Sequence, residues 1–284
     1  MPIAPINGVN IYYEESGEGF PLVWSHEFAG DHRSWAEQVG FFESRYRVVT
    51  YAARGYPPSG IPRNAEAYTL ENAVEDLRAL LDHLKIDRAH IGGLSMGGSV
   101  ALNFGLTHPD RARSLIVAGT GTGCTDPDVF RAAVRRYADL LEAKGMSAMR
   151  EYARSDTRAQ LLRKDAGAWK RFFDGFMEHS AAGSALTFRG VQGGRKPIFE
   201  LEAGLRALEV PTLIMLGDED GPCVEPGLFM KSCIRRSGLV TFPQSGHAIN
   251  LEEPDLFNRT VSDFLSAVES GKWAERDAEA DTAF

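Results

Sequence analysis

The chain has 284 residues, of which 31 are basic and 39 acidic, so its formal net charge at pH 7 is −8. An acidic chain of this kind does not favour nucleic acid or an anionic membrane as its main partner. Hydrophobic residues make up 43% of the sequence, and no apolar run reaches the length of a membrane span. The length suits one large α/β domain, or such a domain with an insertion.

Neither the first residues nor the cysteines indicate secretion. The run Met-Pro-Ile-Ala-Pro-Ile-Asn-Gly lacks the basic stretch and the apolar stretch of a signal peptide. Cys124, Cys223 and Cys233 are too few and too scattered for a disulfide framework, so we expect buried or half-buried thiols. We therefore expect a cytoplasmic protein. The sequence leaves open whether it is a monomer or a homodimer.

Strand and helix signals alternate through the first 120 residues. Short runs rich in Val, Ile and Tyr predict strands, and Leu70 begins an amphipathic helix behind the capping residue Thr69. The Ser-Gly-Glu-Gly run at 16–19 predicts a hairpin turn. Because strands and helices alternate, we expect a parallel sheet with helices on both faces. The predicted strands are 9–14, 21–24, 46–51, 89–91 and 114–118, and the predicted helices are 35–42, 70–84 and 99–107.

This alternation stops near residue 125 and resumes after residue 205. The intervening residues contain no strand-like run, but they contain apolar residues at helical spacing and a glycine-rich break at 190–197. Strand signals return at 211–216 and 238–242, followed by a helix over 254–268. We predict a core formed by 1–124 and 206–270, a helical cap insertion at 125–205, and a polar tail at 271–284 that is frayed from Lys272.

The most informative run is Gly93-Leu94-Ser95-Met96-Gly97, which lies between a predicted strand and a predicted helix. This Gly-x-Ser-x-Gly pattern is typical of a nucleophile elbow, a tight turn that exposes a serine hydroxyl. Side chains at Gly93 or Gly97 would collide where the strand and the helix press together. A serine nucleophile needs a base, and the base needs an orienting acid. Asp220 and His247 follow the last two predicted strands, at the sheet edge where Ser95 is also expected.

Several runs in this order and spacing resemble the α/β-hydrolase superfamily, in its branch with a helical cap. The resemblance extends from about Gly8 to Val268. It implies an α/β-hydrolase fold, with a mostly parallel central sheet, helices on both faces and an inserted helical cap. Esterases, enol-lactone hydrolases and C–C bond hydrolases are similar. The runs that carry the resemblance are Trp24–Phe28, Ala53–Tyr56, Gly93–Gly98, Gly217–Asp220 and Gly246–His247.

The same resemblance implies a catalytic triad that needs no cofactor. Ser95 would be the nucleophile, His247 the base and then the acid, and Asp220 the orienting acid. The backbone N–H groups of Phe28 and Met96 would form an oxyanion hole, which stabilises the charge that develops on an attacked carbonyl.

Other polar residues near these runs are predicted to be structural. Asp218 and Glu219 stand beside Asp220, and acids grouped in a loop are often only solvated. His26 is expected to brace its loop. The sequence shows no cluster with metal-ligand spacing and no dinucleotide or Walker pattern, so we expect neither a metal nor a cofactor.

The chain departs from the resembling family at Glu27, where glycine usually follows the first-loop histidine. Glycine there permits an unusual backbone angle, so Glu27 either holds that angle under strain or belongs to a different loop. Its carboxylate would also oppose negative charge in the presumed oxyanion hole. We therefore expect Glu27 to point away or to be paired, with His32, Arg33 or Arg54 as candidate partners.

The function implied is that of a serine hydrolase acting on a small, largely apolar carboxylic ester or lactone between cap and core. C–C bond hydrolysis of a ring-cleavage diketone is an alternative, and a serine haloperoxidase or perhydrolase would share the triad. A non-catalytic ligand receptor is a remote alternative. The fold alone does not identify the bond that is cleaved. The candidate pocket residues are Glu27, Trp169, Phe172, Phe173 and Phe176, although the aromatic ones are first of all packing residues.

Overall fold

The computed structural model describes residues 2–276. Its centre is one eight-stranded sheet with the order β1-β2-β4-β3-β5-β6-β7-β8. The first two pairings are antiparallel and the other five are parallel. The predicted mostly parallel sheet is confirmed. The strands are β1 (Ile3–Ile6), β2 (Val9–Ser16), β3 (Phe20–Ser25), β4 (Tyr46–Tyr51), β5 (Ala89–Leu94), β6 (Ala112–Ala118), β7 (Thr212–Gly217) and β8 (Ser237–Phe242).

The hairpin at the start of the chain is not where the sequence predicted it. Strands β1 and β2 pair antiparallel, and the two residues between them, Asn7 and Gly8, both have positive φ, of 46° and 74°. Such a turn matches the twist of paired strands. Strand β2 pairs with β4 and not with β3, so the run at 16–19 joins strands that are not neighbours. The prediction was wrong because a glycine-rich run indicates a turn without indicating which strands pair.

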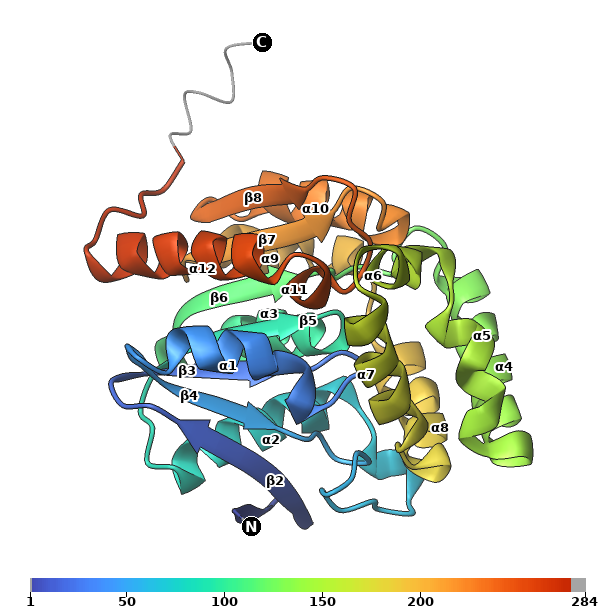
Figure 1. Cartoon of the computed structure of the whole chain (residues 1–284). Helices are drawn as coiled ribbons and strands as arrows, with labels where there is room; N and C mark the ends of the chain where they lie inside the picture. Colours follow the sequence, from blue (N-terminus) through green and yellow to red (C-terminus); the bar gives the residue numbers. More distant parts are fainter. Residues whose placement is uncertain (1, 277–284) are drawn as a thin grey trace.

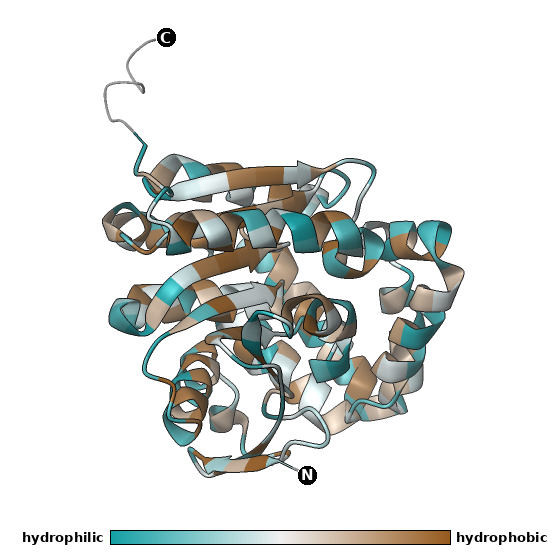
Figure 2. Cartoon of the chain, turned by 60° about the vertical axis from the view of Figure 1, so that its left-hand side comes forward, coloured by the Kyte–Doolittle hydropathy of each residue, from teal (hydrophilic) through white to brown (hydrophobic). Residues whose placement is uncertain are grey.

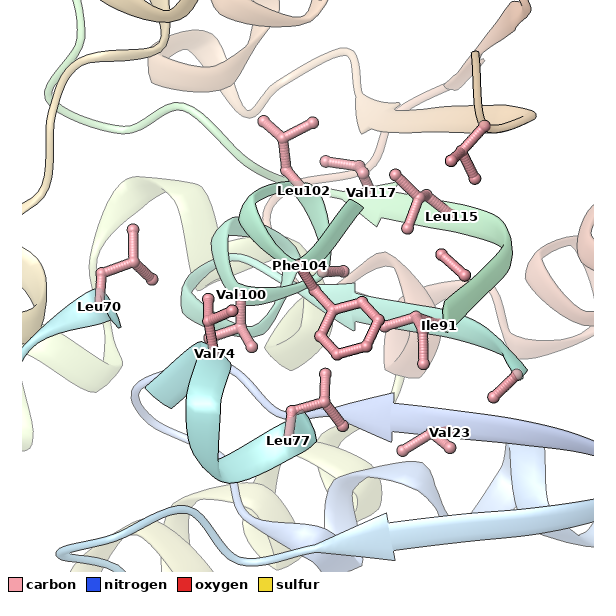
Figure 3. Packing of buried hydrophobic residues seen from close by; sticks show 14 of the residues in the cluster. Val23, Leu70, Val74, Leu77, Ile91, Val100, Leu102, Phe104, Leu115 and Val117 are labelled. Atoms are coloured by element: carbon pink, nitrogen blue, oxygen red, sulfur yellow. The ribbon is translucent and has the colours of Figure 1, made fainter. Parts of the chain in front are cut away.

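Helices cover both faces of the sheet, as predicted. On one face, Figure 3 shows Val74 and Leu77 of α2 meeting Val100 and Phe104 of α3 and Ile91 of β5. The other face carries α1 and α12, and the helices in Figure 2 combine brown and teal residues while the strands are largely brown. The core helices are α1 (Ala36–Phe42), α2 (Leu70–His83), α3 (Met96–Thr107), α10 (Gly221–Cys233), α11 (Ile249–Glu252) and α12 (Pro254–Glu269).

The chain between β6 and β7 forms helices and helical turns joined by short loops, and none of its described residues is in a strand. Figure 1 shows the first five of these helices, α4 to α8, at the side toward which the parallel strands point. None of the described helices combines the length and the apolar character needed to cross a membrane. The division into core and cap at residues 125 and 205 stays a prediction. The inserted helices are α4 (Pro127–Lys144), α5 (Arg150–Ala153), α6 (Ala159–Lys164), α7 (Ala166–Met177), α8 (Ala181–Thr187) and α9 (Glu202–Ala207), with short turns η4 (Gly145–Met149), η5 (Asp156–Arg158), η6 (Phe188–Gln192) and η7 (Ile198–Leu201).

The glycine-rich run at 190–197 does not begin with a break. The π-helical turn η6 continues α8, so Gly190 lies inside a helical segment. A Cβ at Gly190 would lie 1.7 Å from the backbone carbonyl oxygen of Tyr68. Glycine is therefore required by the close approach of two backbones, which the sequence pattern cannot distinguish from a loop.

Replacing Gly190 by alanine should lower the free energy of unfolding by about 1–3 kcal/mol, because the insertion must shift away from Tyr68. Gly194 is the matched control, since a Cβ there would meet no atom within 4 Å. Urea unfolding of both variants measures the difference. Equal stability of Gly190→Ala and Gly194→Ala would contradict the packing described here.

The described part of the predicted tail is packed and not frayed. The ring of Trp273 lies edge-on to that of Phe264 in α12, with 4.6 Å between centroids. Its indole N–H donates to the carbonyl oxygen of Arg236 at 2.9 Å. The prediction of fraying was wrong at Trp273, because it rested on the mostly charged and polar composition of residues 271–284 and gave this one aromatic residue no weight. Residues 277–284 lie outside the described residues.

Candidate active site

Ser95 stands at the turn from β5 into α3 with φ 57° and ψ −110°, a conformation that residues other than glycine rarely adopt. Its backbone N–H donates to the carbonyl oxygen of Ala118 in β6 at 2.8 Å. A Cβ at Gly93 would lie 2.2 Å from the backbone of Gly97, and one at Gly97 would lie 2.0 Å from the Ser25 oxygen. Both glycines are therefore needed, and the second one makes room for β3.

Asp220 and His247 follow β7 and β8, and they form a hydrogen bond in the structure. The Nδ1–H of His247 donates to Oδ2 of Asp220 at 2.7 Å, because an ionised carboxylate can only accept. In the neutral ring, Nε2 is therefore the basic nitrogen. Burial alone would raise the pKa of Asp220, but the charge and hydrogen bond of His247 lower it overall. The carboxylate thus stays ionised and holds the imidazole in one orientation.

Among the described residues, no hydrogen bond joins the Ser95 hydroxyl to His247. The three positions nevertheless meet at one sheet edge. The Ser95 backbone is hydrogen-bonded to Ala118, which precedes Gly119. A Cβ on Gly119 would lie 3.2 Å from the His247 carbonyl oxygen and 3.6 Å from Oδ2 of Asp220. Catalytic hydrogen bonds are often long before a substrate binds. The contact between nucleophile and base stays a prediction.

The loop that carries His247 is held from two sides. The Glu252 carboxylate accepts the backbone N–H groups of Gly246 at 2.6 Å and Ala248 at 3.1 Å. Burial raises the pKa of Glu252. The backbone N–H of His247 donates to the carbonyl oxygen of Thr157, in the inserted region, at 2.6 Å. Sequence reasoning missed Glu252 and Thr157, since neither stands in a recognisable pattern.

Phe28 and Met96, the predicted oxyanion residues, are connected by the buried Tyr56. The Tyr56 hydroxyl donates to the Phe28 carbonyl oxygen at 3.1 Å and lies 3.9 Å from the Met96 sulfur. Met96 is the first residue of α3, where a backbone N–H has no partner within the helix. Their use as an oxyanion hole stays a prediction.

His26 braces the loop that carries Phe28. Its Nε2 accepts the backbone N–H of Ala53 at 3.0 Å, so its Nδ1–H donates to the carbonyl oxygen of Glu27 at 2.7 Å. Burial lowers the pKa of His26 to about 4, which keeps the ring neutral. These bonds are those expected of a structural histidine.

Glu27 is paired, but not with any of the three expected partners. Nη2 of Arg158, in the inserted region, donates to Oε2 of Glu27 at 2.5 Å, and both side chains are buried. Arg54, Arg33 and His32 lie beside other carboxylates. The predicted partners were wrong because Arg158 is 131 residues further along the chain. Glu27 is not among the described residues with positive φ, so its loop differs from one that requires glycine.

Aromatic residues of the insertion surround Phe28. The Phe188 ring stacks on it with 3.8 Å between centroids, and Tyr152 and Phe176 approach it edge-on at 5.8 and 6.2 Å. The Arg158 guanidinium lies over the Tyr152 ring, 4.8 Å from its centroid. These contacts form an apolar wall beside Glu27. Tyr152 and Phe188 had no sequence signal that distinguished them from other packing residues.

The predicted pocket residues do not all reach this wall. Phe176 contacts Phe28, and Phe172 lies 6.5 Å from Phe176. Trp169 and Phe173 stack on each other at 4.9 Å and lie under Arg154 and Arg150. A pocket role for Trp169, Phe172 and Phe173 stays a prediction. Of the four aromatic candidates, Phe176 is the one that contacts Phe28.

The three triad candidates are almost inaccessible to solvent in this structure. The exposed fractions of Ser95, His247 and Asp220 are 9%, 4% and 1%. A hollow of about 430 Å³ lies between α7 and the loop before α1; its lining includes Asp31, Phe172 and Phe176 but none of the three triad candidates. Because Phe176 also contacts Phe28, this hollow reaches the outer side of the aromatic wall.

Asp220, His247 and Cys223 have ligand-type atoms within 4.8 Å of one another, a spacing that a soft divalent cation could use. However, Asp220 and His247 are already joined by a hydrogen bond, which a metal would have to replace. All three cysteines are buried and free. The absence of a metal or cofactor requirement stays a prediction.

Comparison with known proteins identifies the family. The sequence model described as "Alpha/beta hydrolase family" matches residues 19–260. The chain belongs to the alpha/beta hydrolase family. The predicted family resemblance and fold class are confirmed.

Several α/β hydrolases are similar over most of the chain. It is 29% identical to 3-oxoadipate enol-lactonase 1 of Acinetobacter baylyi, covering 87% of this chain and 89% of that one. It is also 29% identical to 2-hydroxymuconate semialdehyde hydrolase of a Pseudomonas species, covering 93% of each. The crystal structure of an enol-lactonase from Burkholderia xenovorans has a TM-score of 0.84 and 27% identity, covering 93% of this chain and all of that one. This α/β hydrolase therefore has relatives of more than one activity.

Proposed function

We propose that the chain is a serine hydrolase that cleaves a small, largely apolar carboxylic ester or lactone through an acyl-enzyme on Ser95. The observation that carries the proposal is the buried hydrogen bond from His247 to Asp220, at the sheet edge where Ser95 turns into α3. The family match supports hydrolase chemistry, and relatives named as enol-lactonases support a lactone or ester substrate.

In the proposed mechanism, Nε2 of His247 takes the Ser95 proton as the serine oxygen attacks the substrate carbonyl. The negative charge on the tetrahedral intermediate is stabilised by the backbone N–H groups of Phe28 and Met96. His247 then gives the proton to the leaving alcohol. Water, activated by the same nitrogen, attacks the acyl-enzyme and releases the acid. Asp220 stabilises the imidazolium that forms at each transfer.

Hydrolysis of a carbon–carbon bond is the second candidate. It is supported by the similarity to 2-hydroxymuconate semialdehyde hydrolase and, at 28% identity, to 2-hydroxy-6-oxo-6-phenylhexa-2,4-dienoate hydrolase of Comamonas testosteroni. The same Ser95, His247 and Asp220 would serve this reaction, so the substrate decides between the two.

The test is a hydrolysis screen of p-nitrophenyl esters of increasing chain length, lactones and vinylogous diketones. We expect turnover of the shorter esters or of a lactone at rates well above those of the diketones. Faster cleavage of the diketones would favour the second candidate. Turnover of none of them, with tight binding of a small ligand, would favour a receptor.

Tyr56 offers a prediction about the oxyanion hole. Replacing Tyr56 by phenylalanine removes its bond to the Phe28 carbonyl and should lower kcat roughly tenfold, less than the loss of a whole oxyanion donor. The KM should change little, because the substrate itself loses no contact.

Tyr68 is the matched control for this prediction. Its hydroxyl also donates to a backbone carbonyl, that of Pro62 at 2.9 Å, in a loop that carries no triad candidate. Steady-state kinetics of Tyr68→Phe should match the wild type. If both variants lose kcat equally, Tyr56 does not position the oxyanion hole.

A further inference from the structure

The carboxylate of Glu27 lies inside the candidate site. Its Oε2 is 4.0 Å from Nε2 of His247, the nitrogen expected to exchange protons with Ser95 and the leaving group. The Glu27 side chain is 1% exposed. Any acyl group bound to Ser95 beside His247 would therefore meet this carboxylate without much intervening water.

Arg158 pairs with Glu27 through a single hydrogen bond. The bond joins Nη2 to Oε2, while Oε1 of Glu27 and Nε of Arg158 are buried and have no hydrogen-bond partner among the described residues. Burial alone would raise the pKa of Glu27, but the charges of Arg158 and His247 lower it overall, so Glu27 is ionised. Arg158 thus already has a resident counter-ion, and that counter-ion keeps one unpaired oxygen.

The groups around His247 therefore carry a net negative charge. Glu27 and Asp220 are ionised carboxylates near its two ring nitrogens, and Arg158 is the guanidinium that acts on both of them. With His247 neutral, these groups leave one net negative charge in a buried space. A second anion would be repelled strongly there, because little water screens it.

The rest of the space beside Glu27 is aromatic. Phe176 and Phe188 both pack against Phe28, and Tyr152 contacts these rings and the Arg158 guanidinium. Such a wall accommodates a flat or apolar acyl group, and its phenylalanine rings offer a carboxylate no hydrogen-bond donor. The net negative charge and the aromatic packing therefore both disfavour an acyl group that carries a carboxylate.

We infer that Glu27 is a specificity-determining residue that makes this hydrolase select uncharged acyl groups and exclude those that carry a carboxylate. Arg158 would bind a substrate carboxylate if it were free, but Glu27 occupies it. This inference rests on the proposed function, since it concerns the acyl group transferred to Ser95.

The test compares two esters of equal chain length, p-nitrophenyl pentanoate and mono-p-nitrophenyl glutarate, which differ in ending with a methyl group or a carboxylate. The wild type should favour the pentanoate in kcat/KM by about tenfold or more, because like charges in a desolvated site repel. Glu27→Gln frees Arg158 and should reduce that ratio about tenfold or more, mainly by lowering the KM of the glutarate. Arg158→Gln should increase the ratio, because Glu27 then lacks its counter-ion.

Glu253→Gln is the matched control. Glu253 also pairs with a cation of the insertion, Lys164 at 2.6 Å, but outside the site, so the ratio should not change. Equal turnover of the two esters by the wild type would overturn the inference. So would a ratio that rises in Glu27→Gln or falls in Arg158→Gln. If Glu27→Gln does not fold, the wild-type ratio and Arg158→Gln still decide. If the wild type cleaves neither these esters nor the lactones, the proposed function fails first, and the inference fails with it.

Discussion

Replacing Ser95 by alanine is expected to lower kcat by roughly 10⁶-fold for any ester that the wild type cleaves, because no other group takes the place of the nucleophile. The fold should be retained. Alanine and serine have the same backbone limits at φ 57°, and the Ser95 backbone bond to Ala118 does not use the side chain. Initial rates and circular dichroism measure the two parts of this prediction.

Ser99, one turn further along α3, is the control for this change. It is buried like Ser95, so Ser99→Ala tests whether losing any buried hydroxyl in this helix affects turnover. We expect its kcat to stay close to that of the wild type. A Ser95→Ala protein that is folded and still turns over at a substantial fraction of the wild-type rate would refute the acyl-enzyme mechanism.

The second large effect concerns Asp220. Asp220→Asn should reduce kcat by about 10⁴-fold, the loss associated with the wrong histidine tautomer. The asparagine amide can donate to Nδ1 of His247, which then holds its proton on Nε2 and cannot act as a base. The volume hardly changes, so the stability should be largely preserved.

Asp218→Asn is the matched control for Asp220→Asn. Asp218 is exposed and accepts the backbone N–H of Ser245 at 3.0 Å, a bond that an asparagine oxygen can keep. Its kcat should therefore remain within a few fold of the wild type. If Asp218→Asn is the more damaging of the two, the orienting acid has been assigned to the wrong residue of this loop.

Local signals in the sequence were sufficient for many of the elements. The run Tyr46–Tyr51 was predicted as a strand with the bounds that β4 has, and Thr69 caps α2 by accepting the N–H of Asn72 at 3.0 Å. The turn at Ser95 was also predictable. Glycines at 93 and 97, between an apolar run and a helical one, satisfy a steric requirement that is local in the chain.

Features that depend on contacts between distant segments were not predictable. The partner of Glu27 is an example, since Arg158 reaches it only because the inserted region returns to the edge of the sheet. Gly190 is another, because its requirement comes from the backbone of Tyr68. The pairing of β2 with β4 likewise depends on the whole sheet. The sequence shows which residue types are available for such contacts, but it does not show which distant residues lie close together in the fold.

The candidate site lies between these two cases. Its polar residues Ser95, Asp220 and His247 were proposed from their order relative to strands, and the structure joins the last two by a hydrogen bond. Its apolar surroundings were predicted less well. Of the aromatic candidates, Phe176 reaches Phe28, whereas the closer contact comes from Phe188, which resembles any other packing residue in the sequence.

The most direct measurement is reaction of the native protein with a fluorophosphonate probe, followed by mass spectrometry of its peptides. An activated serine should form one stoichiometric adduct, located on Ser95, and Asp220→Asn should slow its formation severely. A native protein that hydrolyses esters while its Ser95 stays unmodified, or one that is labelled at a different residue, would contradict the account.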